Sequence, residues 1–136
     1  MSVGTLTTFI ISLVQKVQRE FEKLIVTDKI VVLTTCSSRE EADRIAYQLV
    51  DARLAACVNV LPGIGSIYRW QGAVEQAQEI LLLIKSSRAL FDSLRARIEQ
   101  LHSYSTPEIV ALPIVDGAEG YLNWMNAELQ PTSPSE

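Results

Sequence analysis

The pattern of apolar positions changes along the chain, and its first part is helical. Up to residue 27, large apolar side chains recur at spacings of three and four, which predicts an amphipathic helix. The apolar positions are Leu6, Phe9, Ile10, Leu13, Val14, Val17, Phe21 and Leu24. The polar face mixes acidic and basic residues instead of showing a basic excess. We therefore expect the stripe to dock on the body of its own protein, in preference to a partner or a membrane surface.

From residue 29 onward, short β-branched runs alternate with helical patterns. The predicted strands are 29–35, 56–61, 79–85 and 108–115, and the predicted helices are 38–50, 86–101 and 117–129. Ser38 and Glu41 have the spacing of a capping box, which marks a helix start. Pro62 and Gly63 interrupt an extended pattern that resumes at 66–70. Because proline removes a hydrogen-bond donor from a sheet, we expect a bulge, a kink or a sheet edge there.

The order of these elements is strand, helix, strand, repeated twice. It predicts an α+β fold, a ferredoxin-like βαββαβ sandwich with a C-terminal helix and an extra N-terminal amphipathic helix. The expected division is an N-terminal extension at 1–28, the domain at 29–129, and a polar, disordered tail at 130–136. The run 79–85 is too apolar to face water, so extra helices or a second copy of the chain must cover the open sheet face.

Composition narrows the classes of function. The chain has 136 residues, a net charge of −4 and a pI of about 5.0, with no basic stripe, which argues against nucleic-acid binding. Cys36 and Cys57 do not form a disulfide framework and fit a reducing compartment, so we expect a cytoplasmic protein. No apolar run is long enough to span a bilayer, so we expect no transmembrane segment.

Few residues have side chains suited to metal binding or catalysis. His102 is the only histidine, and it is either a turn residue or a metal ligand completed by a carboxylate such as Glu79 or Glu108, or by other subunits. Cys36 lies where a strand meets a helix N-terminus, which would lower the pKa of its thiol. We nevertheless favour a partly exposed cysteine without a chemical role. We expect Cys57 to be a small buried hydrophobic residue in preference to a nucleophile. With no catalytic triad pattern, we do not expect an enzyme.

Three segments together resemble the CutA family of divalent-ion tolerance proteins. They are "LAACVNVLPGIGSIYRWQGAVEQAQEILLLIKSS" (54–87), "HSYSTPEIVALPI" (102–114) and "YLNWM" (121–125), within a resemblance that spans 30–129. The resemblance implies a ferredoxin-like fold related in architecture to the PII signalling proteins. It also implies a tight homotrimer whose long β-hairpins pair edge to edge, and a role in tolerance of divalent metals, copper above all.

The sequence departs from this family at the positions that bind copper. Enteric members carry a cysteine where this chain has Thr34 and two adjacent histidines where it has Leu101 and His102. Cys36 lies on the same face of a strand as Thr34 if the strand continues that far. The candidate metal ligands are therefore His102, Cys36 and Glu79, in a weak Cu²⁺ site that folding does not require.

A second hypothesis is a PII-like signalling or scaffold trimer that binds a small ligand or a protein partner in clefts between subunits. The residues expected in such a cleft are Trp70, Lys85, Tyr104 and Glu108. A small enzyme that uses Cys57 is a third and less favoured hypothesis. The N-terminal helix lies outside the resemblance, so we expect the trimer to form without it.

Overall fold

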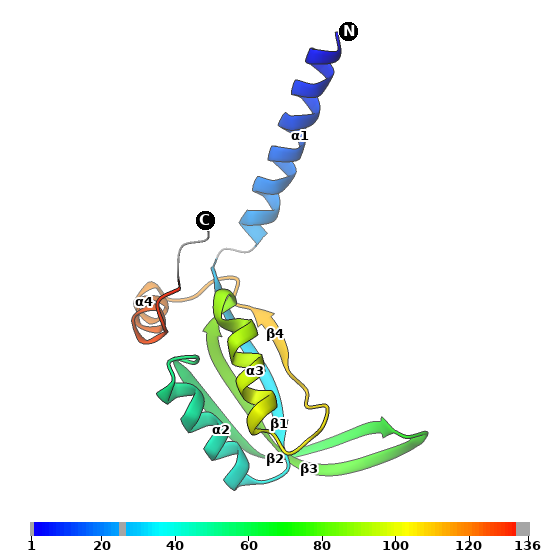
Figure 1. Ribbon diagram of the computed structural model, residues 1–136, viewed down its shortest axis with the longest axis vertical. Coiled ribbons are helices and arrows are strands. Elements are labelled where there is room, and N and C mark those ends of the chain that lie inside the picture. The colour runs from blue at the N-terminus through cyan, green and yellow to red at the C-terminus, as the bar shows by residue number, and fades with distance from the viewer. Residues whose placement is uncertain (1, 25–26, 133–136) are drawn as a thin grey trace.

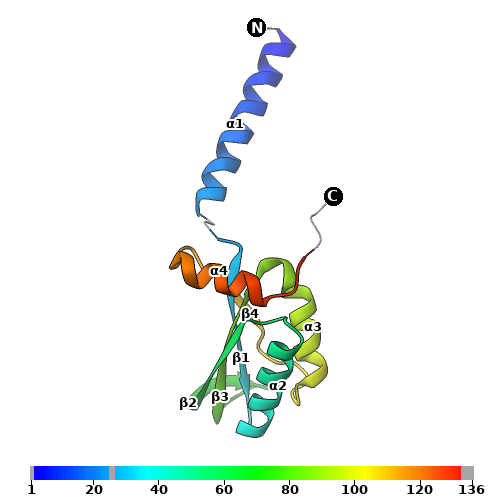
Figure 2. The same ribbon diagram turned by 90° about the vertical axis from the view of Figure 1, so that its left-hand side faces the viewer.

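A computed structural model describes residues 2–24 and 27–132 of the chain (Figure 1). The strands are β1 (Lys29–Cys36), β2 (Cys57–Trp70), β3 (Ala73–Ser87) and β4 (Val110–Pro113). The helices are α1 (Val3–Leu24), α2 (Arg39–Asp51), α3 (Phe91–Leu101), preceded by a 3₁₀ turn at Arg88–Leu90, and α4 (Glu119–Glu128). Within the described residues the strands form one antiparallel sheet in the order β2-β3-β1-β4. Helices α2 and α3 lie on one face of it (Figure 2), which confirms the predicted α+β sandwich.

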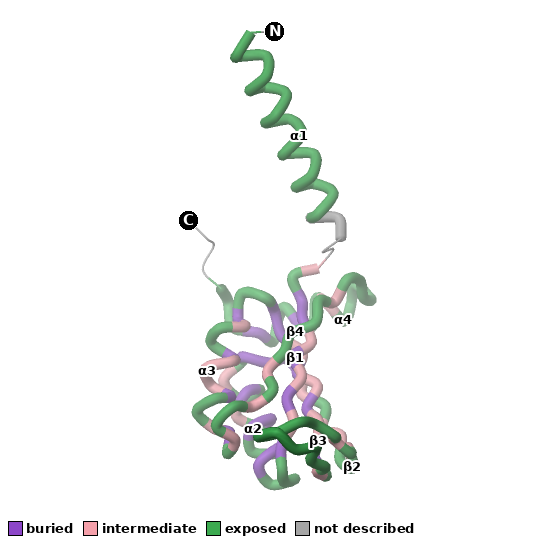
Figure 3. Tube along the Cα trace, turned by 90° about the vertical axis from the view of Figure 1, so that its right-hand side faces the viewer, coloured by how far each residue is buried: buried purple, intermediate pink, exposed green. Residues whose placement is uncertain are grey.

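The hydrophobic core fills the space between this face of the sheet and the two helices. Alternate residues of β1 and β3 point into it, as the two-residue period of a strand requires. The fully buried side chains include Val32, Thr34, Cys36, Leu82, Ile84, Ile45, Leu49, Leu94 and Ile98. Figure 3 shows these buried segments gathered in the body of the protein. Because each large apolar side chain buried there contributes about 1.5–3 kcal/mol, this core positions the ends of β1, α2 and α3 firmly.

Strands β2 and β3 form a hairpin much longer than the sequence pattern predicted. Their arms run for 14 and 15 residues and turn at Gln71 and Gly72, both with positive φ. The pattern missed residues 73–78 because half of them are polar and nearly all are exposed, so they show no apolar alternation. The predicted irregularity at Pro62 is confirmed, since the β2–β3 register shifts between Leu61 and Ile64. Gly63 adopts a φ of 77° within that bulge.

Other boundaries differ by a few residues for clear reasons. The helix predicted at 86–101 starts only at Phe91, because β3 continues through Ser87, whose backbone is extended. Strand β4 is shorter than the predicted 108–115. It has four residues, and all four pair with β1. The closing helix begins at Glu119, two residues later than predicted.

The second face of the sheet is apolar and largely open. Cross-strand neighbours place Leu112 beside Val31, and Leu33 between Val110 and Leu83, on the side away from the core. Leu112 and Val110 are 51% and 45% exposed. Helix α4 crosses only one end of this face (Figure 2), where the Lys85 ammonium donates to the Tyr121 hydroxyl at 3.1 Å. The open face therefore needs cover that the described residues of one chain do not supply.

Helix α1 extends away from the body (Figure 1), and all of its side chains from Val3 to Phe21 are exposed. The expectation that its stripe docks on its own body is therefore wrong for the single chain. An apolar stripe shows that a helix needs a partner surface, but not that this surface belongs to the same chain. None of the described helices is long and apolar enough to cross a membrane. The end of the tail predicted to be disordered, 133–136, lies outside the described residues.

The bulge gives a test of the fold. Changing Gly63→Ala adds a Cβ that meets no atom within 4 Å, so its cost comes only from the positive φ. We expect a loss of about 1 kcal/mol in the free energy of unfolding, measured by urea titration at fixed protein concentration. The matched control is Gly65→Ala, where φ is not positive and the nearest atom lies at 3.9 Å. Equal losses in both variants would contradict this explanation.

Candidate metal centre

Three chemically different donors meet where β1, α2 and α3 end or begin. Cys36 is the last residue of β1, Glu41 lies in the first turn of α2, and His102 follows the last residue of α3. Their sulfur, oxygen and nitrogen atoms lie within 4.8 Å of one another. All three residues are buried. We refer to Cys36, Glu41 and His102 as the triad.

Glu41 is the member that the sequence interpretation missed. The predicted helix start is confirmed, because the Ser38 hydroxyl accepts from the Glu41 backbone N–H at 3.2 Å. In a full capping box the glutamate would turn back to its own N-cap. Instead, Glu41 Oε1 accepts from the Ser103 backbone N–H at 3.1 Å and lies 3.3 Å from His102 Nδ1. The Ser38–Glu41 spacing was the one sequence signal that drew attention to Glu41. We interpreted it as a helix cap, so Glu41 was not considered as a third member of the triad.

Backbone hydrogen bonds hold the His102 ring on both sides. Its Nε2 lies 2.8 Å from the Thr35 carbonyl oxygen, and its Nδ1 accepts from the Tyr104 backbone N–H at 3.0 Å. A neutral imidazole with its proton on Nε2 satisfies both contacts. The Tyr104 ring packs against the imidazole, with centroids 4.7 Å apart. His102 is therefore a structural turn residue and a candidate ligand at the same position.

Cys36 differs from the sequence expectation in its acidity. The strand continues through it and, as predicted, it points to the same buried face as Thr34. Burial, together with the nearby carboxylates of Glu41 and Glu79, raises the pKa of the Cys36 thiol to about 12. The expectation that a helix N-terminus lowers this pKa is wrong, because removal from water and two negative charges outweigh the helix. The sulfur lies 3.9 Å from His102 Nε2.

Glu79, predicted as the carboxylate ligand, has another partner. Its Oε2 accepts from the Tyr104 hydroxyl at 2.9 Å, and it is not a member of the triad. Burial and this bond raise the pKa of Tyr104 to about 12, so the phenol keeps its proton and remains a donor. Glu41 takes the place that the sequence interpretation assigned to Glu79, because α2 begins immediately after β1 and carries Glu41 toward His102.

The residues predicted for a ligand cleft lie apart in one chain. Trp70 is at the end of β2 beside the hairpin turn and is 52% exposed. Lys85 lies over the Tyr121 ring, 5.3 Å from its centroid, while Tyr104 bonds to Glu79 and Glu108 is exposed. Only neighbouring chains could bring these groups together, so the cleft stays a prediction.

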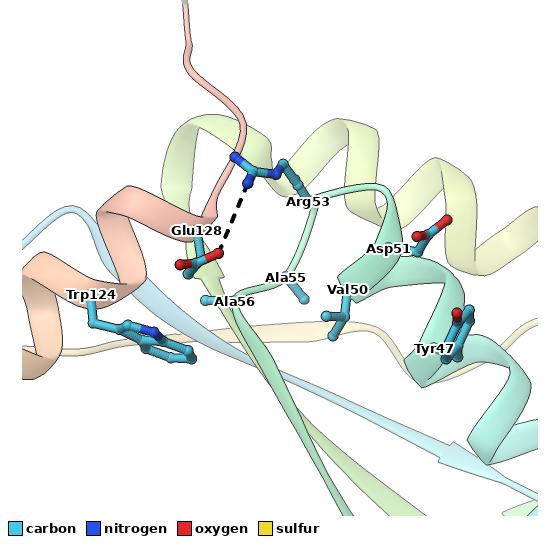
Figure 4. Close-up of a pocket in the computed structure, with 8 residues that line it drawn as sticks. All are labelled: Tyr47, Val50, Asp51, Arg53, Ala55, Ala56, Trp124 and Glu128. Atoms are coloured by element: carbon cyan, nitrogen blue, oxygen red, sulfur yellow. Dashed lines mark ion pairs between the residues drawn. The ribbon is translucent and has the colours of Figure 1, made fainter.

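A separate hollow of about 440 Å³ lies between the end of α2, the turn that follows it, and α4 (Figure 4). Its lining residues are Tyr47, Val50, Asp51, Arg53, Ala55, Ala56, Trp124 and Glu128. The Arg53 guanidinium lies 4.0 Å from the Glu128 carboxylate at its rim. Neither the triad nor the residues of the predicted cleft contribute to it. Its polar groups are on the surface, so it has no buried donor or acceptor set to select a ligand.

Comparison with known proteins places this arrangement in a family. The family model described as "CutA1 divalent ion tolerance protein" matches residues 30–128. The chain belongs to the CutA1 family. The divalent-cation tolerance protein CutA of Thermus thermophilus is 55% identical over 95 residues, which cover 70% of this chain and 92% of that protein. The CutA of Pectobacterium atrosepticum is 43% identical over 103 residues, covering 76% of this chain and 94% of that protein.

Solved CutA1 structures share the fold. The structure of the Thermus thermophilus protein aligns with a TM-score of 0.74 at 51% identity, covering 75% of this chain and 99% of that one. CutA1 from Oryza sativa aligns with a TM-score of 0.75 at 39% identity, covering 76% of this chain and 95% of that one. The family region thus contains the sheet, the hairpin and the triad, whereas α1 precedes it.

The triad predicts a specific dependence of stability on pH. Burial raises the Glu41 pKa, but hydrogen bonds from Ser103, the positive charge of the His102 imidazole in its protonated form and the charge of Arg44 outweigh it, so the pKa is lowered from 4.5. Because the pKa of Glu41 is lower in the folded state, its ionised carboxylate stabilises the protein above about pH 4.5. This contribution is lost as the pH falls through the pKa of the folded state. We therefore expect Glu41→Gln to show a smaller loss of stability between neutral pH and pH 4 than the parent.

The measurement is urea unfolding at both pH values and at one protein concentration. Glu40→Gln is the matched control, because Glu40 is the preceding residue and is exposed. It should keep the acid dependence of the parent. If Glu41→Gln also keeps that dependence, the carboxylate does not gain its contacts on folding.

Proposed function

We propose that this CutA1 protein is a homotrimeric divalent-metal tolerance or response protein that binds Cu²⁺ weakly through Cys36, Glu41 and His102. The observation that carries the proposal is the triad itself, a thiol, a carboxylate and an imidazole buried together. Thiolate and imidazole donors suit copper and zinc, whereas oxygen-only sites suit magnesium and calcium. The triad would hold the ion, and the metal would supply a redox-active or Lewis-acidic centre when bound.

The surroundings of the triad explain why such binding would be weak. Both His102 ring nitrogens are already hydrogen-bonded, so an ion must replace one backbone contact. The Cys36 thiol, with a pKa of about 12, must lose its proton before its sulfur becomes a good ligand. The same protonated state makes Cys36 a poor nucleophile, which supports a non-enzymatic role. A reduced thiol also fits the proposed cytoplasmic location.

The open sheet face supports assembly into a trimer. Residues such as Val31, Leu33 and Leu83 form an apolar surface that the helices leave uncovered, and β2 and β4 are both sheet edges. Unpaired edges and apolar faces are commonly covered by other chains. The resemblance to the CutA family implies that the assembly contains three chains.

Metal binding can be tested on matched cysteine variants. We expect isothermal calorimetry to detect one Cu²⁺ per chain in the parent, with Zn²⁺ in parallel as an ion that does not oxidise thiols. Cys36→Ser should weaken binding by roughly tenfold or more, because it removes the softest donor. Cys57→Ser is the control, since Cys57 is a free cysteine outside the triad.

His102→Ala should also remove the site, provided that circular dichroism shows a folded protein. A parent that binds neither ion, or a Cys36→Ser variant that binds as well as Cys57→Ser, would exclude the triad as the metal site. His102 would then be a turn residue only.

Assembly can be tested on the open face. Leu83→Glu places a charge in the middle of this face, so we expect sedimentation equilibrium to show dissociation of the trimer at micromolar concentration. Gln100→Glu introduces the same group at an exposed position of α3 and should leave the trimer intact. A parent protein that sediments as a folded monomer would contradict the proposal directly.

A further inference from the structure

Helix α1 is the one large element that neither the CutA1 family region nor the triad explains. It ends at Leu24, before the first residue that matches the family model. Val3, Phe9 and Phe21 are 83%, 66% and 61% exposed, within a continuous apolar stripe. A helix with such a stripe is stable in water mainly when another surface covers it. The question is therefore which surface covers α1.

The stripe has the spacing of a helix that packs on helices like itself. Val3, Leu6, Ile10, Leu13 and Val17 follow one another at alternating intervals of three and four residues. This 3.5-residue average keeps one seam facing a parallel neighbour, with β-branched residues at the first heptad position and leucine at the fourth. Glu20 is the charged residue in this seam.

The seam is wider than that of a two-stranded coiled coil. Phe9 borders it on one side, and Val14 and Phe21 border it on the other. In a pair of helices these flanking positions are usually charged, whereas helices in larger bundles carry apolar residues there as well. The residues at the first and fourth heptad positions would also suit two helices. The apolar flanking residues favour a bundle of more than two.

The fold brings the α1 helices of an assembly together. Strand β1 begins at Lys29, shortly after α1 ends, and it is an inner strand of the sheet. Its Val31 and Leu33 lie on the open apolar face. If three such faces meet, the starts of the three β1 strands lie at the same end of the assembly. Figure 1 shows α1 leaving the body at that end, so three helices would run alongside one another in the same direction.

We propose that the α1 helices of three copies pack together as a parallel bundle at one end of the trimer. The inference rests on the proposed trimer. The bundle continues the apolar surface of the open sheet face into the N-terminal extension. A membrane surface is the less suitable occupant, because Glu20 and Glu22 offset two of the three basic residues, Lys16, Arg19 and Lys23, and the helix lacks the strong basic bias of membrane-surface helices.

The test measures amide hydrogen exchange of residues 3–21 in the full chain, with sedimentation of the same samples. In a bundle these amides should exchange roughly a hundredfold or more slower than in an unstructured peptide. Leu13→Asp places a charge in the seam and should remove most of this protection. Gln15→Asp introduces the same residue two positions away, outside the seam, and should keep it. Both variants should remain trimeric, because the sheet faces are unchanged.

A distance measurement separates a bundle from α1 docked on a neighbouring body. Nitroxide labels at Gln15→Cys, in a Cys57→Ser background, should give one narrow interchain distance of roughly 25 Å or less by pulsed electron resonance. Long or broad distances overturn the bundle.

Three further results overturn it. One is fast exchange of α1 in a protein that sediments as a trimer, which leaves the trimer proposal standing. Another is protection that appears only with phosphatidylcholine–phosphatidylserine vesicles, which assigns α1 to a membrane surface. The third is a monomeric protein in sedimentation, which overturns the trimer and the bundle together.

Discussion

The structure depends on a sheet that is apolar on both faces but has helices on only one. In β1, Val32 points into the core while Val31 and Leu33 point to the other side, and β3 repeats this arrangement with Ile84 and Leu83. Helices α2 and α3 cover the first face and fix where β1 ends. The second face has only α4 across one end. Folding of one chain therefore buries one face of this sheet, and the proposed assembly would bury the other.

The covered face also creates the triad, as a result of how three elements meet. The end of β1, the start of α2 and the end of α3 converge, and each leaves backbone groups without partners within its own element. His102 and Glu41 supply these partners to Thr35, Tyr104 and Ser103. The same side chains that close this junction bring nitrogen and oxygen donors to the Cys36 sulfur. If the triad binds a metal as proposed, its structural contacts and the ion would compete for the same donor atoms, which would limit the affinity.

The sequence predicted most of the fold because its apolar periods are unambiguous. The β-branched run of β1, the capping spacing at Ser38, and the break at Pro62 all correspond to observed features. Residues 73–78 of the outer hairpin were missed because, among the described residues, they pair only with the other arm of the hairpin and need no apolar alternation. The predicted docking of α1 on its own body was wrong, because the presence of an apolar stripe does not by itself show that the covering surface belongs to the same chain. Family membership was predictable, since the long motif at 54–87 lies within the region that the family model matches.

Two of the three triad members were predictable, and the third was not, because side-chain direction after a turn is not encoded in residue spacing. Cys36 and His102 were identified as donors, but the third member was assigned to Glu79 instead of Glu41. Glu79 is near enough to raise the Cys36 pKa, yet its carboxylate is turned toward Tyr104. Which carboxylate reaches His102 depends on the path of α2 after Ser38, and that path is set by packing of Ile45 and Leu49 in the core.

Thr34 and Cys36 show how the donor set could shift along one strand. The two residues are separated by one strand period and share the buried face, and the Thr34 hydroxyl has no hydrogen-bond partner among the described residues. An unpaired buried hydroxyl costs about 1–3 kcal/mol, so valine would fit this position better on packing grounds. The resemblance places the metal-binding cysteine of enteric relatives at this position. In this chain a thiol stands one period further along, at the end of β1, where the Glu41 carboxylate lies near it. The strand period preserves the direction of the sulfur, and the start of α2 supplies a new carboxylate beside it.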